Sequence, residues 1–326
     1  MLKDSYKILD SLRLPHGLYL ASSSTHYNYV WIRDSVYMSM PYLDKPCDTY
    51  ERTYHRLLDL FAEYEDKIEY HTKVKPECTW QFIHSRFSAD DVREITHEPW
   101  GHNQLDAIGA FLFGIGAGLA AGKQMLRNNA DERIVAKIVA YLSCIEYWQC
   151  PDNGMWEEDM ELHASSIGAC VAGLISLINT VEVPLEIIDN GIAALRELGD
   201  RESASKDVDL AQLSLIYPYN LVGPDVAERI IAKVESSLLR KRGVIRYAGD
   251  SYYSTLESSH GRYEQKSFYY GTEAEWTFGL PWLALCCHTF GDTEKSVALH
   301  PPDRGSSVRR RDFAGTLLCR DGSAES

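Results

Sequence analysis

Residues 50–68 read YERTYHRLLDLFAEYEDKI, and this stretch decides the fold class. Its apolar side chains recur every three or four positions, at Tyr50, Tyr54, Leu57, Phe61, Tyr64 and Ile68. That spacing places them on one face of an α-helix, because a helix turns once in about 3.6 residues. The stretch therefore predicts a helix with one buried face.

The same period recurs along most of the chain. Similar stripes cover residues 2–12, 30–43, 105–125, 134–148, 167–178, 187–198, 208–216, 226–238 and 276–290. Proline and glycine fall between them, which predicts about ten helices joined by loops. Strand alternation is scarce, and residues 243–253 are the best candidate for a short hairpin. We therefore expect an all-α protein.

The predicted helices carry no repeat motif of the kind found in helical solenoids. A closed toroid of helical hairpins is thus favoured over an open array. In such a toroid the loops at one end converge on a central pocket, where polar and aromatic loop residues can bind a ligand.

The composition limits the kinds of binding partner and the cellular location that we expect. The 326 residues carry a formal net charge of −14, which argues against a nucleic-acid partner, because phosphate backbones require clustered Lys and Arg. Residues 2–12 are amphipathic rather than a secretory signal, and no apolar run reaches the roughly 18 residues of a membrane span. Eight cysteines without CxxC spacing suit a reduced, cytoplasmic protein. No metal-binding motif is visible, so we expect neither metal nor cofactor, and the oligomeric state stays open.

The last residues differ in character. Residues 300–326 contain two prolines and five arginines among Ser and Gly, without a helical stripe. We predict a domain over residues 1–299 and a disordered, atypical tail over residues 300–326. A sharper hypothesis is that the natural coding frame is lost near residue 299.

The loop DNGMWEE, residues 152–158, offers the clearest chemistry. Burial beside Trp156 and repulsion between Glu157 and Glu158 would keep one carboxyl protonated at neutral pH. Such an acid can protonate the leaving oxygen of a glycoside. The alternative is that both carboxylates are solvated or cap a helix.

Two further segments carry arginines. Arg33 and Asp34, in WIRD at a predicted helix start, are either a structural ion pair or a set of donors and acceptors for sugar hydroxyls. Arg246 lies in GVIRY, within the predicted hairpin, and is followed by Asp250 and two tyrosines. Each segment is a modest signal when taken alone.

The segment WGHNQLD, residues 100–106, opens a predicted helix. Gln104 and Asp106 can fix ligand hydroxyls while Trp100 supplies a stacking surface. The alternative is a packed Trp and a helix capped by Asn103. The glycines of residues 114–118 resemble a nucleotide loop, but close helix packing explains them better, because no strand precedes them.

Taken in chain order, these segments resemble glycoside hydrolase family 15, the glucoamylase and glucodextranase family. The same fold forms the N-terminal part of phosphorylase kinase α and β subunits. The resemblance covers about residues 15–295, and order and spacing together make it specific. The matching segments are YVWIRDS (29–35), WGHNQLD (100–106), GMWEE (154–158), HASS (163–166), GVIRY (243–247), EW (275–276) and PWLA (281–284).

The resemblance implies an (α/α)6 barrel, and because about ten helices are predicted where twelve close such a barrel, we expect it to be incomplete at the C-terminus. It also implies inverting hydrolysis of α-glucosidic bonds in glucans or oligosaccharides, releasing β-glucose from chain ends. Glu157 matches the general acid. Arg33 and Asp34 match the pair that grips the non-reducing glucosyl unit. The other predicted substrate-binding residues are Trp100, Gln104, Asp106, Trp156, Glu158 and Arg246.

The general base is the missing element. Inversion needs a second carboxylate roughly 6.5–9.5 Å from the acid, with a water between them. In the family this base lies in a Pro-Glu motif on a loop between the last two helices, and no such motif lies in the C-terminal part of this sequence. Glu273 and Glu275 are substitutes in principle, although they lie at a predicted helix start, where the dipole favours carboxylates. The alternatives are therefore a non-catalytic carbohydrate-binding or regulatory module and, as a weaker one, a trehalase-like hydrolase.

Overall fold

A computed structural model describes residues 2–23, 28–256 and 265–299. The predicted tail after Leu299 lies outside these residues, so the predicted domain boundary stays a prediction. The helices are α1 (Leu2–Leu12), α2 (Ile32–Ser39), α3 (Thr49–Glu63), α4 (Glu65–Tyr70), α5 (Leu105–Ala120), α6 (Asn129–Ile145), α7 (Ala164–Ser176), α8 (Leu185–Leu198), α9 (Pro224–Ser237), α11 (Gly279–Thr289) and α12 (Thr293–Leu299). Short 3-10 helices are η1 (Met40–Tyr42), η2 (Thr79–Gln81), η3 (Leu210–Leu215) and η4 (Lys266–Tyr269).

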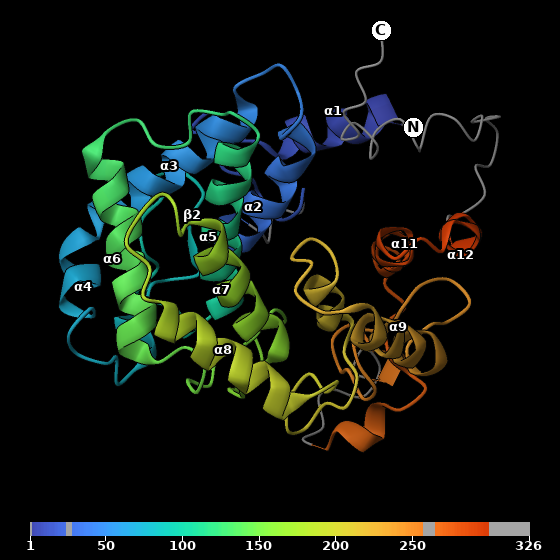
Figure 1. Cartoon of the computed structure of the whole chain (residues 1–326). Coiled ribbons are helices and arrows are strands. Elements are labelled where there is room, and N and C mark those ends of the chain that lie inside the picture. The colour runs from blue at the N-terminus through green and yellow to red at the C-terminus, as the bar shows by residue number, and fades with distance from the viewer. Residues whose placement is uncertain (1, 24–27, 257–264, 300–326) are drawn as a thin grey trace, which may run out of the picture.

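The helices form two layers that alternate along the chain. In the inner layer α2 contacts α5, α5 contacts α7, α7 contacts η3, and η3 contacts α11. The elements between them, α3, α4, α6, α8 and α9, pack outside this row. Figure 1 shows α5 and α7 side by side at the centre, with α3, α4 and α6 on one flank and α9 and α11 on the other. This alternation is that of an α/α toroid, so the predicted all-α class is confirmed.

Glycines allow the inner helices to touch. A Cβ added at Gly109 on α5 would overlap the backbone of Ala169 on α7, and one at Gly173 would meet the Gly109 carbonyl at 2.6 Å. Gly114 similarly lies against the Tyr54 ring of α3. Close helix packing, and not a nucleotide loop, therefore explains the glycines of α5, as predicted.

Two apolar clusters make the core. The larger joins α2, α3, α5, α6, α7 and α8, and it contains most of the stripe that begins at Tyr50. The smaller joins η3, α9 and α11 around Leu213, Val234 and Leu283. No helix within the described ranges is both long and apolar enough to cross a membrane.

Two local predictions were wrong, and one element was not predicted. Residues 243–253 form no hairpin: Val244 instead exchanges backbone hydrogen bonds with Trp276, at 2.9 and 3.0 Å. The stripe at 208–216 is the 3-10 helix η3 rather than an α-helix. In the described residues the one regular sheet pairs β1 (Tyr29–Trp31) with β2 (Arg86–Ser88) in antiparallel register, and no sequence pattern predicted it.

Candidate active site

The predicted site residues lie where the inner elements begin. Arg33 and Asp34 occupy the first turn of α2, and Asp106 the first turn of α5. Glu157 and Glu158 lie on the loop of residues 152–161, between α6 and α7, which we call the acid loop. Arg246 lies in the segment between α9 and α11. The fold thus brings these residues, which are far apart in the sequence, to one end of the inner layer of helices.

Arg33 makes hydrogen bonds to several residues in one half of the site. Its guanidinium is 9% exposed and makes a bidentate pair with Asp106, at 2.5 and 2.9 Å. It also donates to Gln104 Oε1 at 2.8 Å, to the Gly154 carbonyl at 3.2 Å and to Glu157 Oε1 at 3.3 Å. Burial opposes the charge, but the pairing with Asp106 outweighs it and raises the pKa of Arg33. Arg33 therefore stays a fixed cation beside the acid loop.

Gln104 and Asp106 lie behind Arg33. Each is 2% exposed, and both carboxylate oxygens of Asp106 accept from Arg33. Gln104 accepts from Arg33 through its oxygen and donates to the Gly101 carbonyl through its nitrogen, at 2.8 Å. These contacts orient the guanidinium, and sequence reasoning did not foresee that role.

The start of α5 is not capped by Asn103. The side chain of Asn103 donates to the Pro151 carbonyl at 2.8 Å, and the first amide of α5, Leu105 N, donates to Asp152 at 2.9 Å. The alternative of a cap by Asn103 is therefore excluded, because the neighbouring loop, rather than a residue preceding the helix, supplies the acceptor.

Glu157 is held in the state that an acid catalyst needs. Its side chain is 18% exposed, and its carboxyl faces Arg33. Burial raises the pKa of Glu157 to about 7 against the opposing charge of Arg33, and the nearby carboxylates Asp34 and Asp106 add to the rise. Burial agrees with the sequence reasoning, but the repelling groups are Asp34 and Asp106 rather than Glu158.

Glu158 has the opposite environment. Its carboxylate accepts from Lys206 at 3.1 Å, from Arg246 at 3.2 Å and from the Tyr247 hydroxyl at 2.8 Å. Burial opposes ionisation, but the two cations outweigh it, so the pKa of Glu158 is lowered. The pKa values of two adjacent glutamates are thus shifted in opposite directions, which is how active sites assign separate roles to paired carboxyls.

The backbone turns the two side chains apart. Glu157 has φ 62°, in the left-handed region that non-glycine residues rarely adopt. Its N–H donates to the Gly154 carbonyl at 3.2 Å, and the Glu158 N–H donates to the Asn153 carbonyl at 2.9 Å. This local strain directs Glu157 to Arg33 and Glu158 to Lys206 and Arg246.

Arg246 organises an aromatic wall. It pairs with Asp250 through two hydrogen bonds of 2.7 and 2.6 Å. Its guanidinium lies 5.1 Å from the Trp156 ring centroid, 5.0 Å from Tyr252 and 5.7 Å from Trp276. Aromatic faces beside fixed charges suit the alternating apolar and hydroxyl faces of a sugar.

Further partners were missed by sequence reasoning. Trp156 Nε1 donates to Asp209 at 2.8 Å, and buried Lys206 lies 3.9 Å from the Tyr247 ring centroid. Asp209 and Lys206 fall in the charged run RESASKDVD, residues 201–209, which reads as a solvated loop. No pattern in that run distinguishes them.

Trp100 lies beside a different arginine. The Arg86 guanidinium stacks 3.7 Å from its ring centroid, and Thr79 donates to its carbonyl at 2.7 Å. Arg86 also faces the ring of Tyr29, at 4.5 Å. The predicted sugar-stacking role of Trp100 stays a prediction.

Glu273 and Glu275, the two possible substitutes for the missing general base, accept hydrogen bonds from backbone amides of loops. Glu273 accepts from the backbone N–H groups of Gly249 and Gly271, at 2.8 and 2.7 Å, and Glu275 accepts from that of Arg242 at 2.6 Å. Neither opens a helix, because α11 begins at Gly279. Among the described residues, no group of three or more His, Cys, Asp or Glu is arranged to hold a metal ion.

Several known proteins are similar to this chain in sequence. The probable phosphorylase b kinase regulatory subunit alpha of Caenorhabditis elegans is 27% identical over 301 residues, 79% of this chain and 24% of that protein. The Drosophila melanogaster protein of the same description is 25% identical over 96% of this chain and 28% of its own length. The chain thus spans about a quarter of these relatives.

Solved structures share the fold. A wild-type glycosidase superposes with a TM-score of 0.75 at 19% identity, covering 90% of this chain and 80% of its own. The glucoamylase from Saccharomycopsis fibuligera gives 0.58 at 14% identity, covering 87% and 71%. These likenesses confirm the predicted (α/α)6 barrel type. The family described as Glycosyl hydrolases family 15 matches residues 11–261, and the chain therefore belongs to that family.

Proposed function

We propose that this chain is an inverting hydrolase of α-glucosidic bonds in glucans or oligosaccharides, with Glu157 as the general acid. The observation that carries the proposal is the raised pKa of Glu157, about 7, beside an ionised Glu158. A carboxyl with a pKa near the working pH keeps its proton and still transfers it readily. Glycoside cleavage requires that transfer to the leaving oxygen.

The other residues would hold the sugar. Arg33 and Asp34 would bind hydroxyls of the non-reducing glucosyl unit, and Gln104 and Asp106 would act through Arg33. Trp100, Trp156 and Arg246 would contact the sugar faces, and Glu158 would accept a hydroxyl hydrogen. A solved structural neighbour is a glycosidase in complex with glucose, which suits a glucosyl ligand. The net charge of −14 favours such a neutral ligand over nucleic acid.

The test is Glu157→Gln with maltooligosaccharides, isomaltooligosaccharides and trehalose. Glucose release should fall by about 10²- to 10⁴-fold, because the amide cannot donate the proton. Sugar affinity should change little, because the Arg33 contact survives. The product anomer, followed by NMR, should be β-glucose. Unaltered turnover in Glu157→Gln would sink the proposal.

A second candidate is a carbohydrate-binding regulatory module. Its support is twofold: the curated relatives are kinase regulatory subunits, and Glu273 and Glu275 both serve loop amides rather than a reacting water. Oligosaccharide binding by calorimetry, with no product from any of the three substrate classes, would favour this module. A cytoplasmic location belongs to both proposals and is tested by cell fractionation.

A further inference from the structure

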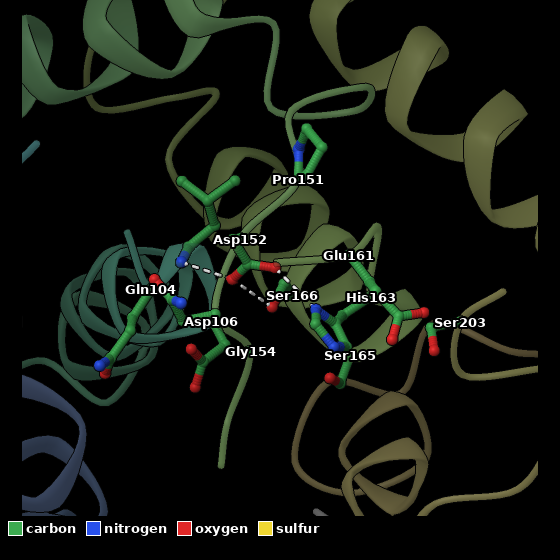
Figure 2. A network of polar contacts seen from close by, with 12 residues as sticks. Gln104, Asp106, Pro151, Asp152, Gly154, Glu161, His163, Ser165, Ser166 and Ser203 are labelled. Atoms are coloured by element: carbon green, nitrogen blue, oxygen red, sulfur yellow. Dashed lines mark hydrogen bonds and ion pairs between the residues drawn. The ribbon is translucent and has the colours of Figure 1, made fainter. Parts of the chain in front are cut away.

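Asp152 joins three segments beneath the acid loop. It is 1% exposed, and its Oδ2 accepts from Leu105 N at 2.9 Å and from the Ser166 hydroxyl at 2.8 Å. Its Oδ1 lies 3.0 Å from His163 Nδ1. Figure 2 shows the carboxylate between these groups, with one oxygen toward Ser166 and the other toward His163. One side chain thus ties the start of α5 to the start of α7.

The same residue closes the base of the acid loop. Asp152 and Glu161 exchange backbone hydrogen bonds of 2.9 and 3.0 Å, so the residues between them form a closed loop that contains Glu157. Because the Asp152 side chain is anchored to both helices, the loop enters and leaves from a fixed point.

The His163 ring supports the turn within this loop. A Cβ added at Gly154 would lie 2.9 to 3.0 Å from three atoms of the ring, so the imidazole contacts the turn directly. The Gly154 carbonyl accepts from both Arg33 Nη2 and the Glu157 N–H, each at 3.2 Å. The ring therefore packs against the residue whose carbonyl bonds both Arg33 and the Glu157 backbone.

His163 is charged at this position. Burial opposes protonation, but the hydrogen bond and charge of Asp152 outweigh it and raise the pKa of His163 to about 9. Glu202 adds to the rise, whereas Lys206 opposes it, and Glu161 also interacts with the ring. A protonated Nδ1 donates to Asp152 at all pH values below this pKa.

We propose that Asp152 and His163 are positioning residues that together hold the Gly154–Glu157 turn against Arg33. Neither touches the reacting atoms. Their effect on turnover rests on the proposed function, but their effect on the environment of Glu157 does not. That difference lets the two ideas be tested separately.

The decisive variants are Asp152→Asn and His163→Asn. An asparagine at 152 must turn an NH2 group toward one of three donors, while an asparagine at 163 keeps a donor near the Nδ1 position but removes the ring. His71→Asn is the matched control, because His71 is equally buried, at 4% exposure, and its ring bonds the Val74 carbonyl near α4, away from the Glu157 loop. Ser166→Ala is the milder variant, removing one donor to Asp152.

The primary readout is the carboxyl titration of Glu157 in the full chain, followed by ¹³C NMR and assigned through Glu157→Gln. In Asp152→Asn and His163→Asn the pKa of Glu157 should fall from about 7 toward 4.5, because the displaced turn exposes the carboxyl. His71→Asn should leave it unchanged. If Asp152→Asn does not fold, Ser166→Ala should still show a smaller fall. A Glu157 titration identical to wild type in the folded variants overturns the proposal.

The second readout is kinetic. Where the wild type hydrolyses a glucan, kcat should fall by about 10- to 100-fold in both variants, with KM within about threefold, because a misplaced acid affects the transition state more than binding. Equal losses in His71→Asn would indicate general destabilisation and count against positioning. If the wild type has no turnover, the proposed function fails, while the Glu157 titration still decides this inference.

Discussion

Replacing Glu157 with glutamine should change how the stability of the protein depends on pH. The folded pKa of Glu157, about 7, lies above its unfolded value of 4.5. Between these values the native state keeps a proton that the unfolded state releases, so the free energy of unfolding falls as pH rises. The rise in pKa corresponds to about 3 kcal/mol, at about 1.4 kcal/mol for each pKa unit. That penalty is absent below pH 4.5 and complete above pH 7.

Glutamine carries no such penalty. The stability of Glu157→Gln relative to wild type should therefore rise by about 3 kcal/mol between pH 4.5 and 7.5. The assay is urea unfolding followed by tryptophan fluorescence at several pH values. Buried groups that titrate in both proteins, such as Glu202 and His163, cancel in the difference. A difference that stays constant within about 0.5 kcal/mol across this range would refute the reasoning.

Glu158→Gln is the matched control with the opposite sign. The folded pKa of Glu158 is lowered, so its contribution to stability is present above its unfolded value and is lost as pH falls through the folded pKa. Glu158→Gln should therefore be less stable than wild type at pH 7.5, and the deficit should shrink in acid. Two neighbouring glutamates with opposite pH slopes would exclude a general effect of charge removal.

Other substitutions test the frame around the site by urea unfolding. Arg33→Lys should lose about 3 kcal/mol, because lysine cannot replace the buried bidentate pair. Gly109→Ala should lose about 2 kcal/mol or more through overlap with the Ala169 backbone. Asn128→Ala should lose about 1 kcal/mol with its cap hydrogen bonds to the first turn of α6.

The helices could be predicted because a helix with one buried face has apolar residues at every third or fourth position. The stripe that begins at Tyr50 is buried as predicted, and α1 has the predicted limits. The break between α3 and α4 was missed, because the apolar spacing continues across Tyr64. The three-residue strands β1 and β2 were missed because they are too short to show alternation, and their pairing joins residues 57 positions apart, such as Val30 and Phe87.

The site was predictable only where a local motif carries it. Arg33, Glu157 and Arg246 stand in recognisable segments, and the structure brings them to one end of the inner layer. The groups that set the charge of the two glutamates come from elsewhere. Lys206 reaches Glu158 across 48 positions, and a contact of that kind has no period or spacing to reveal it.

The energetic penalty at Glu157 bears on the choice between hydrolase and binding module. Above neutral pH, burial of this carboxyl destabilises the native state by about 3 kcal/mol. A site that only holds sugar hydroxyls gains nothing from it, because an ionised carboxylate is the stronger acceptor. Donation of a proton to a leaving oxygen, by contrast, requires a carboxyl that is still protonated near pH 7. Glu158, ionised one residue away, already supplies an acceptor for binding, so the raised pKa of Glu157 favours the proposed hydrolase over the proposed binding module.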